Sequence, residues 1–473
     1  MNNGMIKVIT GVRRCGKSVL LFDLFYNYLL ERGVPEECII RIALDDIDNE
    51  ALLDPHVLAE YISEHTKDQT KQYYVFLDEI QFAITQDELK NKDTYVRLYG
   101  VLNGLLRRKN IDVYVTGSNS KLLSTDVMTE FRGRGDRIHV APLSFSEYYP
   151  AHGGTKEEAW NDYLMYGGMP YILRLPAEEK VRYLTELNNE IYLKDISERY
   201  GISNSSGMED LQKVLASAVS SLTNPQKIAD TFKSSGMKGV SAPTIKDYIG
   251  YLQDAHLIQK AERYDVKGRK YISTPSKYYY TDLGLRNALL GFRQFEETHL
   301  MENVIYNELV YRGFSVDVGV VGINTVENGR KIRKQLEVDF VANLGSQRYY
   351  IQSAYAIPDK EKMEQEQASL INVPDSFKKI IVVESGLPLW RNEQGITIMN
   401  IYDFTLEELE DYLVSNGFKK FNATQIIEWI YEKDVTDCRP ADEHFRFRTG
   451  SGTGRNQVRQ DFTQFRYILR KGS

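Results

Sequence analysis

The chain has 473 residues, of which 42% are hydrophobic and 26% charged. This composition is typical of a soluble globular protein, and the length predicts roughly two to four domains. The formal net charge of −7 excludes an attraction of the whole molecule to nucleic acid. Any contact with DNA must therefore come from a local basic patch.

The cysteines and the apolar segments indicate a cytoplasmic protein. Cys15, Cys38 and Cys438 are too far apart in the sequence to form a disulfide framework or a zinc site. No apolar run approaches the roughly 18 residues of a membrane-spanning helix, and no charged and apolar leader opens the chain. We therefore expect no membrane association.

The first element in the chain is a phosphate-binding loop. Residues 11–18 follow the pattern G-x-x-x-x-G-K-S. A predicted buried strand, residues 5–10, precedes the loop, and a predicted helix, residues 18–31, follows it. Strand, glycine-bounded loop and helix are the context in which this motif binds nucleotides.

Each part of the loop has a predicted role. Gly11 and Gly16 let the backbone N–H groups turn toward a triphosphate, and the helix N-terminus adds the positive end of its dipole. Lys17 would reach the β- and γ-phosphates of ATP, and the Ser18 hydroxyl would take one Mg²⁺ position. The loop residues predicted to bind the nucleotide are Gly11, Val12, Arg13, Arg14, Cys15, Gly16, Lys17 and Ser18.

A second predicted strand, residues 73–78, ends in two carboxylates. A buried parallel strand would bring Asp78 beside the phosphate loop, where it would hold Mg²⁺ directly or through water. Glu79 would polarise a water molecule for in-line attack on the γ-phosphate. The pattern predicts an ATPase with Asp78 as a metal ligand and Glu79 as the catalytic glutamate.

A further predicted strand, residues 111–116, is followed by a polar segment, Gly117-Ser118-Asn119-Ser120. In sheets of this kind, the strand between the loop strand and the Mg²⁺ strand carries a polar sensor at its tip. Ser118 or Asn119 would then touch the γ-phosphate or the attacking water. The same residues would also serve as an N-terminal cap for the next helix. Both interpretations remain open, and they are compatible.

The order of elements predicts the domain organisation. In residues 1–150, predicted strands alternate with helices, which predicts a right-handed parallel α/β sheet. Besides the three strands named above, strands are predicted near residues 38–44 and 136–142. The segments that follow are a helical lid (151–205), helices and a hairpin (206–292), a mixed α/β domain (293–405), and an accessory helix with a basic tail (406–473).

Several motifs in the same order make the chain resemble a group of AAA-family ATPases from bacteria and archaea. This group is close to the archaeal-type and STAND-like P-loop ATPases, and its members carry a C-terminal domain of unknown function. The motifs are residues 9–18 (ITGVRRCGKS), 77–81 (LDEIQ), 115–120 (VTGSNS), 142–148 (PLSFSEY), 166–170 (YGGMP), 192–196 (YLKDI) and 337–341 (EVDFV). The resemblance covers roughly residues 5–410. Family members usually have a further segment before the first strand, so we expect the N-terminus to be truncated or mis-started.

The resemblance also implies a role for an arginine just before the last core strand. In related ATPases an arginine at the position of Arg132 or Arg134 acts on the nucleotide of a neighbouring subunit. Such a finger requires a homo-oligomer. The alternative is a solvated turn, and Arg134 is carried as a candidate catalytic residue.

The segment 206–292 has the order of a winged helix. Two helices with polar caps begin at residues 224–229 and 241–252, and a hairpin around residues 266–270 follows them. The resemblance implies the same fold. A winged helix that only packs within the protein is the alternative to one that binds duplex DNA. The residues suited to DNA phosphate contacts are Lys246 on the recognition helix and Arg263, Lys267, Arg269 and Lys270 on the wing.

The segment 293–405 resembles the PD-(D/E)XK nuclease fold, with Glu302 and Glu308 on a predicted helix. Asp339 matches the first acid of that motif, but Gln352 and Ala354 stand where the motif has an acid and a lysine. Glutamine is a poor Mg²⁺ ligand, and alanine cannot orient or deprotonate water. We therefore expect a degenerate nuclease-like domain without nuclease activity.

The tail from Gly417 onward weakly resembles the N-terminal helical segment of radical-SAM ribosomal RNA methyltransferases. No three-cysteine cluster for an iron–sulfur centre accompanies it. We treat this tail as an accessory helix and a basic, partly disordered extension.

The sequence as a whole predicts an ATP-binding, Mg²⁺-dependent hydrolase that converts ATP and water to ADP and phosphate. A DNA-associated motor or switch is one interpretation of the work it drives. A signalling or defence switch, in which the nucleotide controls exposure of the C-terminal domain to a protein partner, is an alternative, and a nucleotide-binding module with negligible turnover is another.

Overall fold

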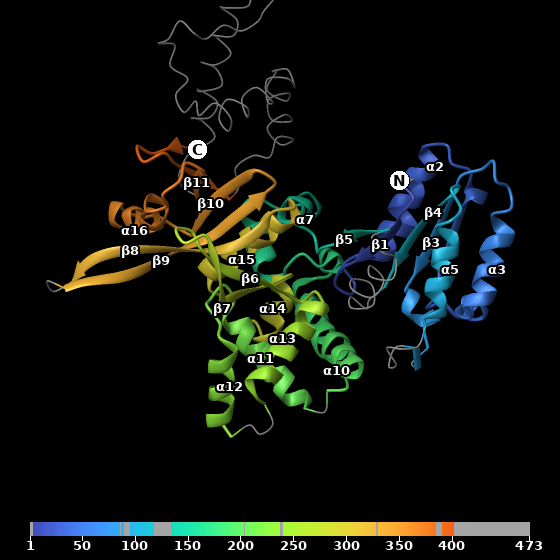
Figure 1. The fold of residues 1–473 in the computed structure, drawn as a ribbon, viewed down its shortest axis with the longest axis horizontal. Helices are drawn as coiled ribbons and strands as arrows, with labels where there is room; N and C mark the ends of the chain where they lie inside the picture. Colours follow the sequence, from blue (N-terminus) through green and yellow to red (C-terminus); the bar gives the residue numbers. More distant parts are fainter. Residues whose placement is uncertain are drawn as a thin grey trace, which may run out of the picture. The chain divides into compact units, whose positions relative to one another are not determined.

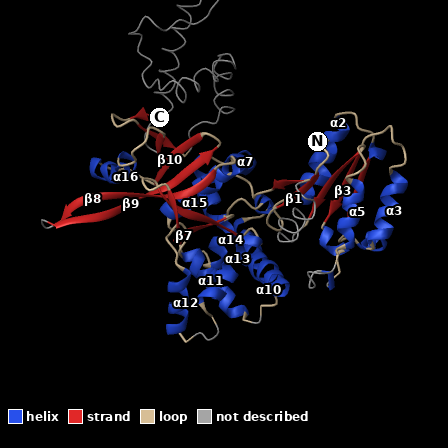
Figure 2. Cartoon of the chain, viewed as in Figure 1, coloured by secondary structure: helices blue, strands red, loops and turns tan. Residues whose placement is uncertain are grey.

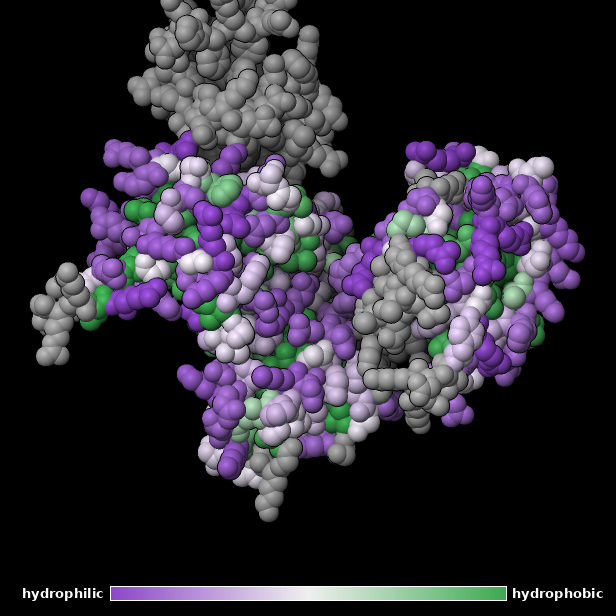
Figure 3. Space-filling model, in the orientation of Figure 1, coloured by the Kyte–Doolittle hydropathy of each residue, from purple (hydrophilic) through white to green (hydrophobic). Residues whose placement is uncertain are grey.

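The computed structural model of the chain describes residues 3–85, 87–88, 95–117, 134–202, 204–236, 240–327, 330–384 and 390–401. Two compact units divide the chain, residues 1–348 and residues 349–473. The predicted tail, including Cys438, lies outside the described residues. None of the helices among the described residues is long and apolar enough to cross a membrane. Hydrophilic residues cover most of the face drawn in Figure 3.

The first unit opens with a five-stranded sheet (Figure 1). All its strands are parallel and lie in the order β2-β3-β4-β1-β5. The strands are β1 (Ile6–Thr10), β2 (Ile39–Ala43), β3 (Tyr73–Asp78), β4 (Ile111–Thr116) and β5 (Gly135–His139). The predicted parallel α/β sheet is therefore confirmed, with small differences at the strand ends. The order also places β4 between the loop strand β1 and the acid strand β3, as predicted.

Helices cover both faces of this sheet (Figure 2), which explains why the strands β1, β3 and β4 are buried along their whole length. On one face, Val75 and Leu77 belong to a core with residues of α3 (Pro55–His65) and α5 (Arg97–Leu105). On the other, Phe76 packs with residues of the helical run after the phosphate loop. This run consists of α1 (Lys17–Val19), the π-helical η1 (Leu20–Phe25) and α2 (Tyr26–Glu31). Short 3₁₀ helices are η2 (Glu36–Cys38), η3 (Ile47–Leu53) and η4 (Ile80–Ala83).

A helical segment follows the sheet. Its elements are α7 (Phe145–His152), α8 (Lys156–Tyr166), η6 (Pro170–Arg174), α9 (Ala177–Glu186), the π-helical η7 (Leu187–Leu193) and α10 (Lys194–Tyr200). Two of the helices start with capping boxes, Ser144 with Glu147 before α7 and Thr155 with Glu158 before α8. These side chains satisfy backbone N–H groups that a helix start leaves without partners.

Three helices and a hairpin come next, in the predicted order. They are α11 (Ser205–Ser217), α12 (Pro225–Ser234), α13 (Ala242–Asp254), β6 (Ile258–Asp265) and β7 (Lys270–Tyr280), followed by α14 (Leu283–Leu289). Asn224 and Ser241 cap α12 and α13 through their side chains. Thr223, between α11 and α12, forms an antiparallel bridge to Ser276 of β7.

The first unit ends with α15 (Glu297–Tyr311) and the antiparallel strands β8 (Ser315–Glu327) and β9 (Arg330–Leu344). β6 pairs in parallel with the middle of β8, at residues 318–320. Beyond that point, β8 and β9 continue as a two-stranded arm, which Figure 1 shows extending past β6 and β7. The sequence did not predict this arm.

The second unit is a smaller α/β arrangement. Its strands are β10 (Gln347–Ala354), β11 (Lys378–Val383), β12 (Trp390–Arg391) and β13 (Ile396–Asn400), and its helix is α16 (Lys360–Ile371). β10, β11 and β13 run parallel, whereas β12 pairs with β13 in the antiparallel sense. Asp359 caps the start of α16.

Candidate nucleotide-binding site

The phosphate loop has the backbone conformation that its glycines predict. Gly11 and Gly16 have φ angles of 148° and 101°, which glycine adopts more readily than other residues, and Arg14 also has a positive φ of 65°. A Cβ atom on Gly11 would lie 2.0 Å from the carbonyl oxygen of Val140. Only glycine therefore fits at this position.

Lys17 is buried and points into the loop. Its ammonium group donates hydrogen bonds to the carbonyl oxygens of Gly11 and Val12, at 3.2 and 2.9 Å. Cys15 is also buried, and its thiol contacts the carbonyl oxygen of Val140 at 3.3 Å. Burial raises the pKa of this thiol, so Cys15 fills space beneath the loop and does not act as a thiolate.

Asp78 is the last residue of β3, and it lies beside the loop helix. The Ser18 and Thr116 hydroxyls both donate hydrogen bonds to its carboxylate. Burial raises the pKa of Asp78, and these two hydrogen bonds oppose that rise. The structure thus brings together Ser18 and Asp78, the two residues predicted to hold Mg²⁺.

Thr116 connects the two predicted acids. It ends β4, and its Oγ1 accepts a hydrogen bond from the backbone N–H of Glu79 at 3.2 Å while donating to Asp78. Glu79 itself has a left-handed conformation (φ 51°), and its carboxylate accepts a hydrogen bond from the Gln81 amide. Sequence reasoning missed Thr116 and Gln81 as parts of this site.

The oxygen donors at this site fit a magnesium ion held together with phosphate. Mg²⁺ is usually bound by one or two carboxylates, phosphate oxygens and water, and Ser18 and Asp78 supply a hydroxyl and a carboxylate of this kind. Among the described residues, no group of three or more His, Cys, Asp or Glu side chains forms a metal site.

Some predicted residues of the site lie elsewhere. Ser118, Asn119 and Arg132 fall outside the described residues. Arg134 is exposed immediately before β5, and its guanidinium contacts the Asn103 side chain at 3.4 Å. Both interpretations of Ser118 and Asn119, and the finger role of Arg134, stay predictions.

A cavity of about 880 Å³ is lined by residues that follow the phosphate loop and by residues of β5. Leu20, three residues after Lys17, lines it, and so does Val140, whose carbonyl oxygen contacts Cys15. Its polar lining includes His139 and His256, whose rings lie 4.8 Å apart. Burial lowers the pKa of His139, which keeps this ring neutral near pH 7.

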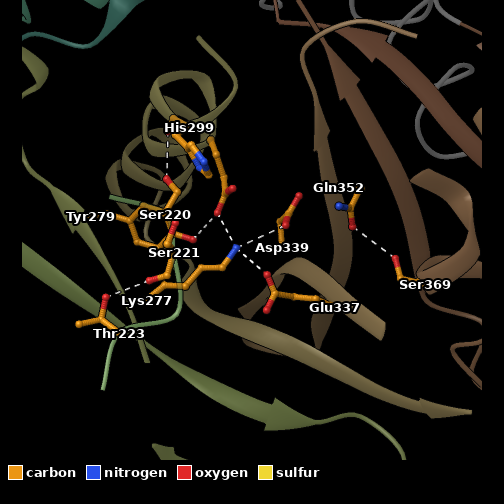
Figure 4. Close-up of polar contacts among 11 residues, drawn as sticks. Ser220, Ser221, Thr223, Lys277, Tyr279, His299, Glu337, Asp339, Gln352 and Ser369 are labelled. Carbon is orange, nitrogen blue, oxygen red and sulfur yellow. Dashed lines mark hydrogen bonds and ion pairs between the residues drawn. The ribbon is translucent and has the colours of Figure 1, made fainter. Parts of the chain in front are cut away.

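The acids of the predicted nuclease-like region surround a lysine that the sequence analysis did not single out (Figure 4). Lys277 of β7 is buried, and its ammonium lies 2.9 Å from Glu302, 2.7 Å from Glu337 and 3.5 Å from Asp339. Tyr279 also donates a hydrogen bond to Glu302, at 2.7 Å. The cation among these carboxylates is therefore a side chain of the protein.

The other two positions of that motif lie in the second unit. Gln352 accepts a hydrogen bond from the Ser369 hydroxyl at 3.3 Å, and Ala354 is buried. Neither side chain supplies an acid or a base.

Comparisons with known proteins agree with this geometry. Residues 3–149 match the model of the AAA domain, an ATPase-type domain, and residues 157–296 match a domain of unknown function (DUF8612). An uncharacterized protein of Haemophilus influenzae is 31% identical over 408 residues, which cover 85% of this chain and 94% of that protein. Uncharacterized protein MJ1544 of Methanocaldococcus jannaschii is 30% identical over 374 residues, 76% of each chain. The chain belongs to the family of these two proteins.

This AAA-domain protein has a further similarity at its C-terminus. Residues 399–440 match the ribosomal RNA large subunit methyltransferase N-terminal domain. The probable dual-specificity RNA methyltransferase RlmN of Geobacillus kaustophilus is 55% identical over 58 residues, which are 12% of this chain and 16% of that protein. The predicted resemblance of the tail is thus confirmed as a sequence similarity.

Proposed function

We propose that the AAA domain binds ATP with Mg²⁺ and hydrolyses it to ADP and phosphate. The observation that carries this proposal is the meeting of the Ser18 and Thr116 hydroxyls at the Asp78 carboxylate, next to a buried Lys17. A hydroxyl, a carboxylate and an ammonium group at the ends of adjoining elements are the groups that magnesium and a polyphosphate need.

The residues divide the work by their chemistry. Lys17 and the loop amides hold the phosphates, and Ser18 and Asp78 would hold the magnesium, which supplies charge neutralisation for the transferred phosphoryl group. Glu79 orients the attacking water and accepts its proton. Thr116 keeps the two acids in place from the neighbouring strand.

Phosphate release from ATP tests this function, with and without Mg²⁺. We expect Glu79→Gln to lower turnover by about 10²–10⁴-fold, the range of a general base, without loss of nucleotide binding. Lys17→Ala should lose both ATP turnover and nucleotide binding. Turnover by Glu79→Gln equal to that of the wild type would remove Glu79 from the mechanism.

The cavity beside the loop supports a place for the nucleoside. Leu20 and Val140 offer apolar contacts to a base, and His139 and Gln253 offer hydrogen bonds. We expect Leu20→Glu to weaken Mg²⁺–ATP binding but to leave the binding of Mg²⁺–tripolyphosphate unchanged. If Leu20→Glu weakened the binding of Mg²⁺–ATP and Mg²⁺–tripolyphosphate equally, the adenine base would lie outside this cavity.

Association with duplex DNA is a second candidate function. The order α11-α12-α13-β6-β7 and the bridge between Thr223 and Ser276 support a winged helix. The candidate residues are Lys246, Lys267, Arg269 and Lys270, all exposed. ATP turnover that rises on adding duplex DNA would favour a DNA-associated ATPase. Slow turnover with a nucleotide-dependent change of molecular size would favour a signalling switch.

We propose no nuclease activity for the C-terminal α/β region. The ammonium group of Lys277 forms ion pairs with Glu302, Glu337 and Asp339, and the side chains of Gln352 and Ala354 lack the acid and the base that hydrolysis requires. Mg²⁺-dependent DNA cleavage that Asp339→Ala abolishes would contradict this proposal.

A further inference from the structure

The helix expected to recognise DNA offers little positive charge. The outer face of α13 exposes Lys246, but the acidic Asp247 is its neighbour. The last turn of α13 is covered by Tyr200 of α10, whose ring stacks on Tyr251 at 3.7 Å and whose hydroxyl donates to Asp254 at 2.9 Å. A DNA major groove could reach only the start of this helix.

The turn between β6 and β7 is positively charged and held against β8. The carboxylate of Asp265 accepts a hydrogen bond from the backbone N–H of Gly268 at 2.9 Å, and this hydrogen bond fixes the turn. The backbone N–H of Val266 donates to the carbonyl oxygen of Val320 at 3.0 Å. The turn residues therefore have a defined position beside the base of the arm.

Two cations converge on one residue of the arm. The Lys267 ammonium donates to the carbonyl oxygen of Gly322 at 2.7 Å. The Arg333 guanidinium lies 3.3 Å from the position that a Cβ atom on Gly322 would occupy. The acceptor of the Lys267 ammonium is an uncharged carbonyl oxygen, so this contact does not neutralise the lysine.

Arg263 extends this cationic surface along the same face. Its guanidinium donates to the Gln335 side chain at 3.1 Å. Arg333 and Gln335 are two positions apart on β9 and so share one face of the strand. Among the described residues, none of these side chains forms an ion pair. We define the arm-base surface as Arg263, Lys267, Arg269, Lys270 and Arg333.

The chemistry of this surface favours a polyanion over an apolar protein partner. The exposed apolar residues nearby are Tyr271 and Ile332. Tyr271 lies opposite Tyr264, which follows Arg263 on β6, and Ile332 precedes Arg333 on β9. Because side chains alternate along a strand, Tyr271 and Ile332 lie on the face opposite to Arg263 and Arg333. A face with several cations and without an apolar centre is typical of a phosphate-contacting surface.

We propose that the arm-base surface, rather than helix α13, binds the phosphate backbone of duplex DNA. Arginine and lysine side chains suit phosphate oxygens, and a phosphate between Lys267 and Arg333 would relieve their mutual repulsion. This inference rests on the proposed association with DNA, but it does not depend on ATP hydrolysis. Contacts limited to the backbone make binding independent of DNA sequence.

Fluorescence anisotropy of the full chain with a labelled random-sequence duplex of about 20 base pairs tests the proposal. Neutralising about five phosphates predicts a slope of about −4.5 for log affinity against log salt concentration. The variant Lys267→Glu/Arg333→Glu should lower this slope by about 2 and weaken binding more than about tenfold. Lys233→Glu reverses the charge of an exposed lysine on α12 and is the matched control, which should bind like the wild type, whereas Lys246→Glu tests the contribution of α13 directly.

The outcomes separate the surface from the function. Loss of binding by Lys246→Glu, with normal binding by Lys267→Glu/Arg333→Glu, would overturn the assigned surface while the association with DNA stands. A wild-type chain that does not bind duplex DNA would overturn the association itself. Equally tight binding of polyglutamate would identify an acidic protein partner and also overturn the proposal. Unchanged ATP binding by the double variant would show that its fold is intact, so that its loss of DNA binding supports the surface.

Discussion

The hydroxyl of Thr116 donates a hydrogen bond to the carboxylate of Asp78 and accepts one from the backbone N–H of Glu79. One side chain at the end of β4 therefore fixes two acids at the end of β3. These two strands are neighbours in the sheet, with Leu77 opposite Val115. The candidate metal ligand Asp78 and the candidate general base Glu79 depend on this strand pairing for their positions.

Replacing Thr116 by valine keeps the shape of the side chain but removes both hydrogen bonds. We expect turnover of ATP to fall by about 10–100-fold, the usual effect of losing a group that orients a metal ligand. Thr116→Ser keeps the hydroxyl and should restore most of the activity. Steady-state phosphate release measures both variants, and activity of Thr116→Val within twofold of the wild type would contradict this role.

A buried ion pair between β1 and β4 should make the stability of the AAA domain sensitive to the loss of one partner. Lys7 and Asp112 are in direct contact, and the Tyr114 hydroxyl donates to Asp112 at 3.0 Å. Asp112→Ala leaves a buried lysine without its carboxylate and should lower the unfolding free energy by about 3–5 kcal/mol.

The double variant Lys7→Met/Asp112→Leu removes both charges and should recover most of that loss. Urea unfolding followed by circular dichroism measures each change. A double variant as unstable as Asp112→Ala would show that the pair itself does not explain the effect.

The cluster around Lys277 predicts a loss of stability as the pH rises. Burial and the nearby Asp339 raise the pKa of Glu302 to about 8, above the ordinary value of 4.5, although Lys277 opposes this rise. The folded chain thus binds a proton that the unfolded chain releases. Its contribution to stability is complete below about pH 4.5 and is lost as the pH rises through about 8.

Glu302→Gln mimics the protonated acid and removes this dependence. Relative to that variant, the wild type should lose up to about 1.4 kcal/mol of unfolding free energy per pH unit in this range. Denaturation curves between about pH 5 and pH 9 give the comparison. If the unfolding free energies of the two proteins changed with pH in parallel, Glu302 would not have the raised pKa that we expect.

The surroundings of Glu88 predict a loss of stability as the pH falls, opposite to the effect of Glu302. Burial alone would raise the pKa of Glu88, but hydrogen bonds from Thr85 and Arg97 lower it to about 2. Its stabilising effect is therefore complete above about pH 4.5 and is lost as the pH falls toward 2.

Glu88→Gln should cost roughly 1.5–3 kcal/mol near pH 7, as expected for hydrogen bonds to a charged group. Thermal unfolding of the wild type and the variant should converge as the pH falls below 4.5. A difference that stays constant down to pH 3 would contradict the assignment.

The parts of the site that the sequence predicted are those encoded within short segments. The glycines of the phosphate loop and the acids after β3 are recognisable because local backbone geometry and chemistry require those residue types. Strands β1 to β4 were also predictable, since each is a short and mainly apolar run, whereas β5 (Gly135–His139) is more polar and carries a weaker signal.

The parts that were missed depend on contacts between distant segments. Thr116 and Lys277 lie 38 residues from Asp78 and 25 residues from Glu302 along the chain, and nothing in either local sequence indicates those contacts. The arm of β8 and β9 was missed for a similar reason, because the cationic character of its base arises only when the β6–β7 turn packs beside Gly322.

Calorimetric titration of the full chain with ATP in the presence of Mg²⁺ tests the central claim most directly. We predict binding to a single site that Lys17→Ala abolishes and that chelation of Mg²⁺ weakens, because the ammonium and the metal both contact the phosphates. The absence of any binding heat for the folded wild-type chain, across a range of temperatures, would contradict the claim.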